Sequence, residues 1–187
     1  PNLLELINLL ESYASVLNIW QTFQANWSIL STIFAREAIT SLIPQLEPKY
    51  QTVRRRWMLI VRHINEHSTM KHLLKFPSII DTFNENNQIL QTIISSLGSF
   101  IEQKRKVHPR LFMISDCDVI SLFSNMSADV FESIIVQMLM HVKKLDIQSR
   151  ETSDFGVYKV LGIEGENCET LLFNQVIPFT NNFESWF

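Results

Sequence analysis

Apolar residues recur at helical spacing through the first part of the chain, and no proline or glycine interrupts residues 2–34. Two rows with a seven-residue spacing can be traced there, one through Leu6, Tyr13, Trp20, Trp27 and Phe34, the other through Leu3, Leu10 and Leu17. This periodicity predicts one long helix from Asn2 to Phe34. The pattern covers too few turns to establish a coiled coil, so we expect the helix to pack into an antiparallel bundle.

Further helices are predicted along the next part of the chain. Pro44 and Pro48 mark a short connection, after which apolar residues at helical spacing run from Tyr50 to Ile64. A short helix follows Ser68, and a capping box in residues 78–81 predicts the start of another long helix. Its apolar stripe is interrupted at residues 86–87, and Gly98 lies in its interior. Either feature could mark a bend or a close helix contact, and the pattern leaves both alternatives open.

The long helix is expected to end abruptly. Residues 104–106 are three cations, which stabilise the negative end of a helix dipole. Pro109 cannot continue the helix, and it disfavours helical backbone at His108. Residues 111–114 form an apolar run too short for a helix, so we expect them to be buried and extended. Ser115 then predicts a new helix that begins at once.

This junction is predicted to be a rigid weld between two helical parts. A flexible hinge would not place four consecutive apolar residues, 111–114, in a core. We therefore expect bending elsewhere, at residues 44–48 or 68–77. After Ser115, a helix starting at Ser127 is expected to end on the cations Lys143 and Lys144.

The pattern changes near the end of the chain. Residues 146–154 are polar, and β-rich runs follow on both sides of residues 162–167. Three of the four glycines lie within residues 156–165, so we predict a β-hairpin at about residues 155–173. The predicted fold class is therefore mainly α, with one β-hairpin near the C-terminus.

Composition restricts the function classes. The chain has 187 residues, of which 46% are hydrophobic and 19% charged, as in ordinary soluble globular proteins. A formal net charge of -3 gives no electrostatic case for nucleic acid. No apolar run approaches a transmembrane span, so no membrane partner is expected. Cys117 and Cys168 are expected to be reduced structural thiols. The absence of an initiator Met and a final helix that stops after about one turn predict a fragment of a longer chain.

No catalytic, cofactor-binding or metal-ligating set is predicted. His63 and His67 are spaced as in zinc proteases, but Glu66 adjoins the second histidine and His72 is no evident third ligand, so surface histidines are the favoured interpretation. No P-loop spacing of glycines and no Ser-His-Asp or Cys-His arrangement occurs. We therefore expect this fragment not to be an enzyme, with no cofactor of its own.

Three separated motifs resemble the linker of dynein heavy chains, which precedes their first AAA module. The first motif includes Trp20, Gln21, Trp27, Leu30, Ile33 and Phe34. The second includes Lys104, Arg105, Pro109, Arg110, Phe112, Ile114, Ser115 and Asp118. The third includes Glu164, Gly165, Glu166, Val176 and residues 183–187. Their order and spacing resemble the family, although His108, Met113 and Asp116 stand where the family has an aromatic residue, Tyr and Asn.

The resemblance implies a fold, a function and partners. The expected fold is an elongated array of antiparallel helical bundles, divided here into residues 1–109 and 110–187. The implied function is a mechanical linker that transmits ATP-driven changes of the AAA ring into a power stroke along microtubules. Implied partners are the AAA ring of the parent chain and, through the parent, dynein intermediate and light chains and microtubules. ATP and Mg²⁺ would bind in the parent's AAA modules.

Candidate site residues follow from the same resemblance. The structural junction is assigned to Pro109, Arg110, Phe112, Ser115 and Asp118. Glu164, Gly165 and Glu166 are assigned to a contact with the AAA ring, since a solvent-exposed turn suits a contact tip better than an acid pair in catalysis. The expected location is the cytoplasm or cytoskeleton, including the cilium or flagellar axoneme. The alternative is a helical scaffold or adaptor domain for protein–protein interaction, unrelated to a motor.

Overall fold

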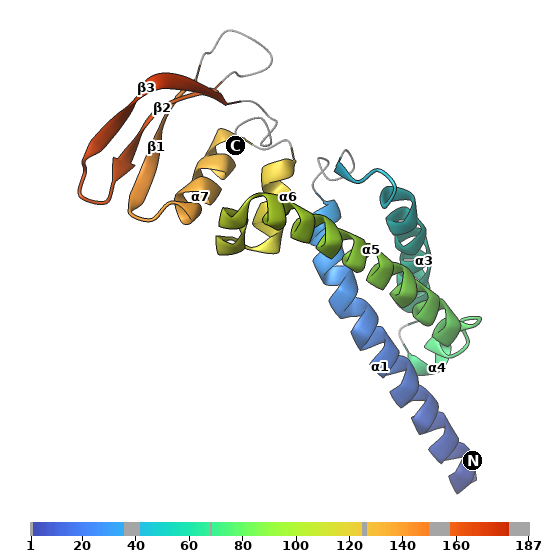
Figure 1. The fold of residues 1–187 in the computed structure, drawn as a ribbon. Helices are drawn as coiled ribbons and strands as arrows, with labels where there is room; N and C mark the ends of the chain where they lie inside the picture. The colour runs from blue at the N-terminus through green and yellow to red at the C-terminus, as the bar shows by residue number, and fades with distance from the viewer. Residues whose placement is uncertain (1, 36–41, 68, 125–126, 150–157, 180–187) are drawn as a thin grey trace. The chain divides into compact units, whose positions relative to one another are not determined.

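The structure is a computed structural model that describes residues 2–35, 42–67, 69–124, 127–149 and 158–179 (Figure 1). The chain forms two compact units, Pro1–Gly98 and Ser99–Phe187. The fold is mainly α, with an antiparallel sheet near the C-terminus, which confirms the predicted fold class. The domain boundary predicted between residues 109 and 110 stays a prediction.

Among its described residues, the first unit is built mainly from three long helices. They are α1 (Leu3–Phe34), α3 (Glu47–Glu66) and the first part of α5 (Ile79–Val107), with the short α4 (Met70–Leu73) between the last two. Helix α1 matches the long helix that the sequence predicts. Ser78, the first residue of the predicted capping box before α5, has a φ of 50° instead of the extended backbone that a capping serine usually has. Among the described residues, no helix combines the length and hydropathy that a membrane crossing requires.

Aromatic side chains make up much of the core of the first unit. Phe23 is fully buried and lies 5.0 Å from Trp57 and 5.3 Å from Phe83, measured between ring centroids. Tyr50 stacks between two rings of α1, 5.3 Å from Trp27 and 4.2 Å from Phe34. Burial raises the pKa of Tyr50, an effect that Arg54 opposes and Glu47 reinforces. The rings therefore hold α1, α3 and α5 against one another.

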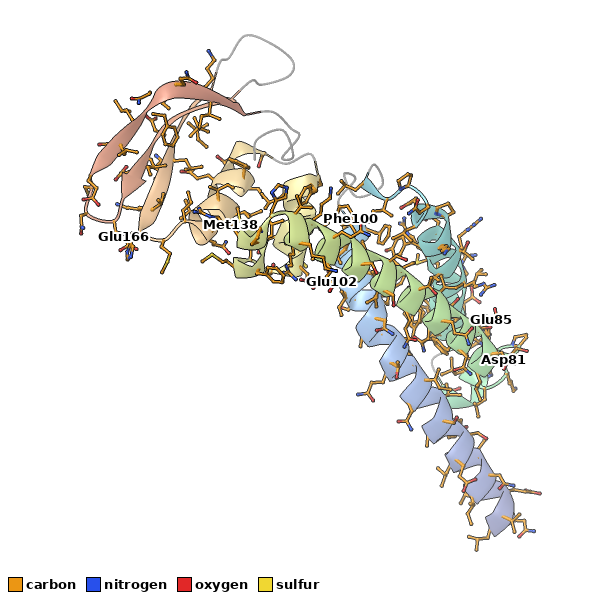
Figure 2. All side chains as sticks on the ribbon, viewed as in Figure 1. Asp81, Glu85, Phe100, Glu102, Met138 and Glu166 are labelled. Carbon is orange, nitrogen blue, oxygen red and sulfur yellow. The ribbon has the colours of Figure 1, made fainter. Side chains whose placement is uncertain are left out.

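Asn86 and Asn87 lie where α5 packs against the other helices. Asn86 is fully buried, and its Oδ1 accepts a 3.4 Å hydrogen bond from Nη1 of Arg56 in α3. The same Arg56 atom lies 2.9 Å from Glu85, which Figure 2 labels on α5. Asn87 Nδ2 donates to the Ile19 carbonyl of α1 at 3.4 Å. The interruption in the apolar stripe is thus a polar contact between helices.

The second unit combines short helices with a small sheet. The end of α5 leads into the 3₁₀ helix η1 (Pro109–Met113), followed by α6 (Asp116–Phe123) and α7 (Ala128–Met138). Strands β1 (Val142–Ser149), β2 (Tyr158–Gly165) and β3 (Thr170–Phe179) then form an antiparallel sheet in the order β1-β2-β3. Strands β2 and β3 are the predicted hairpin, and residues 155–157 of that prediction lie outside the described residues.

The predicted end of the helix after Ser127 is wrong. Helix α7 ends at Met138, and Lys143 and Lys144 lie in β1 instead of capping the helix. His141, with a φ of 64°, lies in the turn between the two elements. Residue Leu145 is only 2% exposed, and its backbone N–H donates to Glu132 Oε1 of α7 at 2.8 Å. Packing of β1 against α7 and pairing with β2 therefore outweigh the helical signal of the two lysines.

We expect Gly98→Ala to stabilise the chain by about 1 kcal/mol, because Gly98 is exposed inside α5 and glycine is a poor helix former. A Cβ built at Gly98 would meet no atom within 4 Å, so no contact among the described residues opposes the change. Urea unfolding of the chain measures the effect.

Gly162→Ala is the matched control, since a Cβ there would collide with the backbone carbonyl of Leu171 on β3. We expect this variant to lose about 1–3 kcal/mol. Equal effects of the two substitutions would contradict the distinction between an open and a crowded glycine.

Candidate functional site

The candidate junction lies where α5 ends and the chain turns into η1 and α6. Val107 is the last residue of α5, and His108 leaves helical backbone with φ −122° and ψ 88°. Pro109 is the first residue of η1, a position that tolerates proline because no backbone N–H is needed there. Only two residues separate the end of η1 from the start of α6. The sequence prediction of an abrupt helix end at Pro109 is confirmed.

Arg105 connects all three segments of the junction. Its Nε donates to the Leu111 carbonyl at 3.2 Å, and its Nη2 donates to the Ile114 carbonyl at 2.9 Å. Its Nη1 lies 2.8 Å from Asp116 Oδ1 in the first turn of α6. The Arg105 side chain is 19% exposed, whereas that of Asp116 is 66% exposed. The two carbonyl bonds are therefore the stronger part of this contact, because solvent screens the ion pair.

Aromatic rings surround the cations at the end of α5. Lys104 Nζ lies 4.7 Å from the ring centroid of Phe123 in α6 and 5.4 Å from that of Phe100 in α5. The guanidinium carbon of Arg105 lies 5.5 Å from the ring of Phe112. Cation–π attraction adds about 0.5–1 kcal/mol per contact at exposed sites. These cations therefore join elements together in addition to matching the helix dipole.

Ser115 and Asp118 form the predicted N-terminal cap of α6. Ser115 has extended backbone, and its Oγ accepts the Asp118 backbone N–H at 3.2 Å. The same hydroxyl donates to Asp118 Oδ2 at 2.6 Å. This arrangement satisfies an N–H group that would otherwise lack a partner in the first turn.

The prediction that residues 111–114 are buried and extended is wrong in part. Residues 109–113 form a 3₁₀ turn, and only Ile114 has extended backbone. Leu111 and Ile114 are buried, but Phe112 and Met113 are 65% and 54% exposed. A single 3₁₀ turn points successive side chains in different directions, so it cannot bury the whole run. Of the other predicted junction residues, Pro109 and Arg110 are exposed.

The second candidate site is the tip of the hairpin, labelled at Glu166 in Figure 2. Glu164 Oε1 lies 3.9 Å from Lys143 Nζ, and Glu166 Oε2 lies 3.6 Å from His141 Nδ1. The Glu166 backbone N–H donates to the His141 carbonyl at 3.1 Å, so the turn before β1 supports the tip. Glu166 is exposed, while Glu164 and Gly165 are half-buried. The two carboxylates therefore face one basic group of β1 and one of the turn before it.

The three candidate histidines gather at the end of α3. His67 lies 5.2 Å from His63 and 4.9 Å from His72 between ring centroids. His63 Nε2 lies 3.0 Å from the His72 carbonyl, and His72 Nδ1 lies 2.6 Å from the Thr69 hydroxyl. Within the described ranges, no group of three or more His, Cys, Asp or Glu side chains is arranged to hold a metal ion. In these contacts the three imidazole rings pack against one another.

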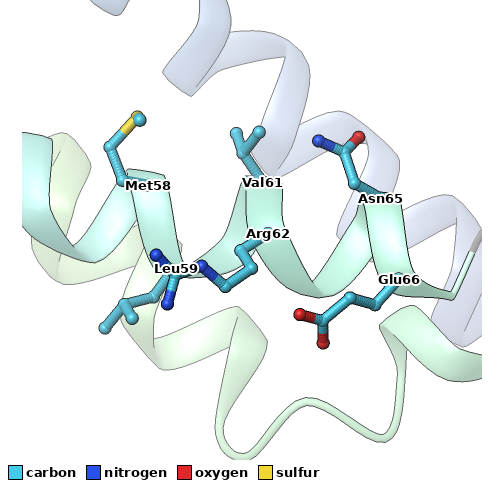
Figure 3. A pocket seen from close by; sticks show the side chains of 6 residues that line it. All are labelled: Met58, Leu59, Val61, Arg62, Asn65 and Glu66. Atoms are coloured by element: carbon cyan, nitrogen blue, oxygen red, sulfur yellow. The ribbon is translucent and has the colours of Figure 1, made fainter.

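A hollow opens on the outer face of α3 (Figure 3). Its lining includes one carboxylate and one guanidinium among apolar and amide side chains: Met58, Leu59, Val61, Arg62, Asn65 and Glu66. Met58 and Leu59 are 58% and 57% exposed. The Arg62 guanidinium and the Glu66 carboxylate are the charged groups of this lining.

Arg105 is the junction residue that sequence reasoning undervalued. The pattern placed it among three helix-ending cations, residues 104–106, with one shared role. The side-chain chemistry distinguishes Arg105 from the two lysines beside it. Arginine offers a planar fork of five donors and can bind several acceptors at once. An arginine before a proline turn, where carbonyls lose their helical partners, is a candidate for that task.

Comparison with known proteins gives a consistent result. The family model described as "Dynein heavy chain, N-terminal region 2" matches residues 2–187. Human dynein axonemal heavy chain 1 is 25% identical over 180 residues, which are 96% of this chain. Dynein axonemal heavy chain 1 of Rattus norvegicus is 25% identical and dynein axonemal heavy chain 2 of Mus musculus 24% identical, each over 91% of this chain. The matched region is only 4% of the length of each of these relatives.

We expect Arg105→Ala to lower the free energy of unfolding by about 2–3 kcal/mol, because two backbone carbonyls lose a charged donor. Arg105→Lys should recover only part of this loss, since one ammonium cannot replace the fork. Amide exchange across residues 111–115 should also accelerate. Chemical unfolding and hydrogen exchange measure both effects.

Lys106→Ala is the control, because Lys106 is 71% exposed and its only described ion pair, with Glu102, spans 4.0 Å. Its effect should stay within about 0.5 kcal/mol. Rapid exchange across residues 111–115 in the unaltered chain would show that the junction is not a weld.

Proposed function

Because this chain belongs to the dynein heavy chain N-terminal region 2 family, we propose that it is a mechanical linker segment of a dynein heavy chain. In this role it transmits ATP-driven changes of the AAA ring into a power stroke for movement along microtubules. The observation that carries the proposal is the family match over residues 2–187. A match of that extent disfavours the alternative of a scaffold or adaptor unrelated to a motor.

The junction at Arg105 supports a force-bearing role. A segment that transmits displacement needs joints that do not yield when they are loaded. The Arg105 guanidinium binds carbonyls on both sides of the exposed pair 112–113, and Ser115 caps the next helix at once. Opening the turn would leave these polar groups without partners, which resists local unfolding. Bending is accordingly proposed at residues 44–48 or 68–77.

The fragment is proposed to act without chemistry of its own. No residue of the junction or the tip forms a nucleophile and base arrangement in the described geometry. ATP and Mg²⁺ are proposed to bind the AAA modules of the longer heavy chain, and the fragment itself needs no cofactor. A mutation in the linker is then expected to alter movement along microtubules while ATP hydrolysis in the AAA modules continues.

The partners are proposed from the same family membership. The hairpin tip at residues 164–166 is proposed to contact the AAA ring of the parent chain, and dynein intermediate and light chains and microtubules are engaged through that parent. The relatives reported above are named axonemal heavy chains, so we propose a place in the cytoskeleton of a cilium or flagellum. No nucleic acid and no membrane is included among the proposed partners.

In the intact motor, we expect Arg105→Ala to slow microtubule gliding several-fold while ATP hydrolysis continues, because a softened junction absorbs displacement. Lys106→Ala is the matched control and should glide at the unaltered speed. Gliding velocity and microtubule-stimulated ATPase are measured on the same preparations. Unchanged gliding with Arg105→Ala would contradict the mechanical role of the junction, and parallel loss of both activities would point to a catalytic effect instead.

We expect the double charge reversal Glu164→Lys and Glu166→Lys to change gliding velocity without unfolding the chain. Both carboxylates belong to exposed or half-exposed surface pairs, which contribute about 0–1 kcal/mol each, so thermal unfolding should shift little. Glu102→Lys makes one such charge reversal on the exposed surface of α5, away from the tip, and serves as control. Normal gliding with the double variant would remove the tip from the proposed contact.

A further inference from the structure

The first turns of α1 expose an unusually apolar surface. Every described residue from 2 to 12 is exposed, and the first buried side chain of α1 is Val16. Figure 1 shows this end of α1 extending past the other helices of its unit. Six of the eight residues 3–10 are nevertheless large and apolar. Their exposed fractions range from 39% to 73% in Leu3, Leu4, Leu6, Ile7, Leu9 and Leu10.

Two apolar rows run along α1 on different sides. One row contains Val16, Phe23 and Leu30, which are all fully buried in the first unit. The other contains Leu3, Leu10 and Leu17, which are 73%, 56% and 48% exposed. The second row is one residue further along, so it lies about 100° around the helix from the first. The helix therefore carries one covered face and one bare face.

The bare face has the spacing of a helix-packing seam. Leu3, Ile7, Leu10, Ala14 and Leu17 alternate between steps of four and three residues, as the core positions of a coiled coil do. The row becomes polar at Gln24 and Ser31, where the helix lies within its own bundle. Apolar character on this side is thus confined to the part of α1 that has no cover.

We propose that a helix of the longer heavy chain, from outside residues 1–187, packs along the Leu3–Leu10–Leu17 row of α1. The length of chain outside this structure supports that occupant, because the matched region is only 4% of the length of the relatives. An amphipathic helix typically packs its apolar stripe against another element of the protein. This docking surface rests on family membership, and it does not depend on the mechanical role proposed above.

Charge specifies the occupant further. Glu5 and Glu11 are the only charged residues between positions 2 and 34. A second copy of α1 would bring no opposite charge to either carboxylate, and its own acids would add repulsion. Glu11 flanks the Leu3–Leu10–Leu17 row, whereas Glu5 lies on the opposite side of the helix. The docked helix is therefore expected to carry leucine or isoleucine at its core positions and Lys or Arg beside Glu11.

Hydrogen exchange on the 187-residue chain and on the purified intact heavy chain tests this surface. Amides of residues 7–15 should exchange rapidly in the shorter chain, since this part of the helix lacks tertiary support. They should exchange at least tenfold more slowly in the intact heavy chain. Equal rates would overturn the proposal. Two other results would also overturn it. One is exchange in the shorter chain that slows as its concentration rises, which indicates a second copy. The other is exchange in the intact heavy chain that slows only when accessory chains are added.

Variants identify the face. Leu10→Lys, and the milder Leu10→Gln, should restore at least tenfold faster exchange over residues 7–15 in the intact heavy chain. Ser12→Lys is the control, because Ser12 is exposed but lies off the Leu3–Leu10–Leu17 row. None of the three substitutions should shift the unfolding midpoint of the 187-residue chain. Retained protection with both Leu10 variants would exclude this row as the contact, whatever the motor's gliding behaviour.

Discussion

The Arg105 guanidinium is the interaction on which the junction of the second unit depends. A helix that stops leaves carbonyl groups without N–H partners, and a proline turn supplies no donor at Pro109 itself. The guanidinium donates to the carbonyls of Leu111 and Ile114 from a single rigid plane. Position 105 therefore fixes both the path of the turn and the place where α6 starts. A lysine has the charge for this task but not the geometry.

The sequence predicted the parts of the junction whose chemistry is local. Pro109 stops a helix and Ser115 caps one through bonds to near neighbours, so their roles can be inferred without a fold. The conformation of residues 111–114 could not be inferred in the same way. It is set by the bonds from Arg105, which lies six residues before Leu111 and nine before Ile114. An apolar run thus became a 3₁₀ turn with only Leu111 and Ile114 buried.

Periodicity located the long helices but not the faces they bury. In α1, the rows through Leu10 and Phe23 have the same seven-residue spacing, yet one is exposed and the other fully buried. Only the positions of α3 and α5 decide between them. Strand β1 was missed for a related reason, because Lys143 and Lys144 resemble a helix end until β2 and α7 are present to pair with it. Tertiary partners override such local signals.

The two candidate sites differ in how readily their bonds can be exchanged. At the tip, Lys143 and His141 are 60% and 80% exposed, so water and salt compete with their contacts to Glu164 and Glu166. A partner that offers cations can replace these contacts at little cost in free energy. At the junction, Arg105 is mostly buried and bonds to backbone carbonyls that have no such substitute. The tip is therefore suited to a contact that forms and breaks, and the junction to one that persists.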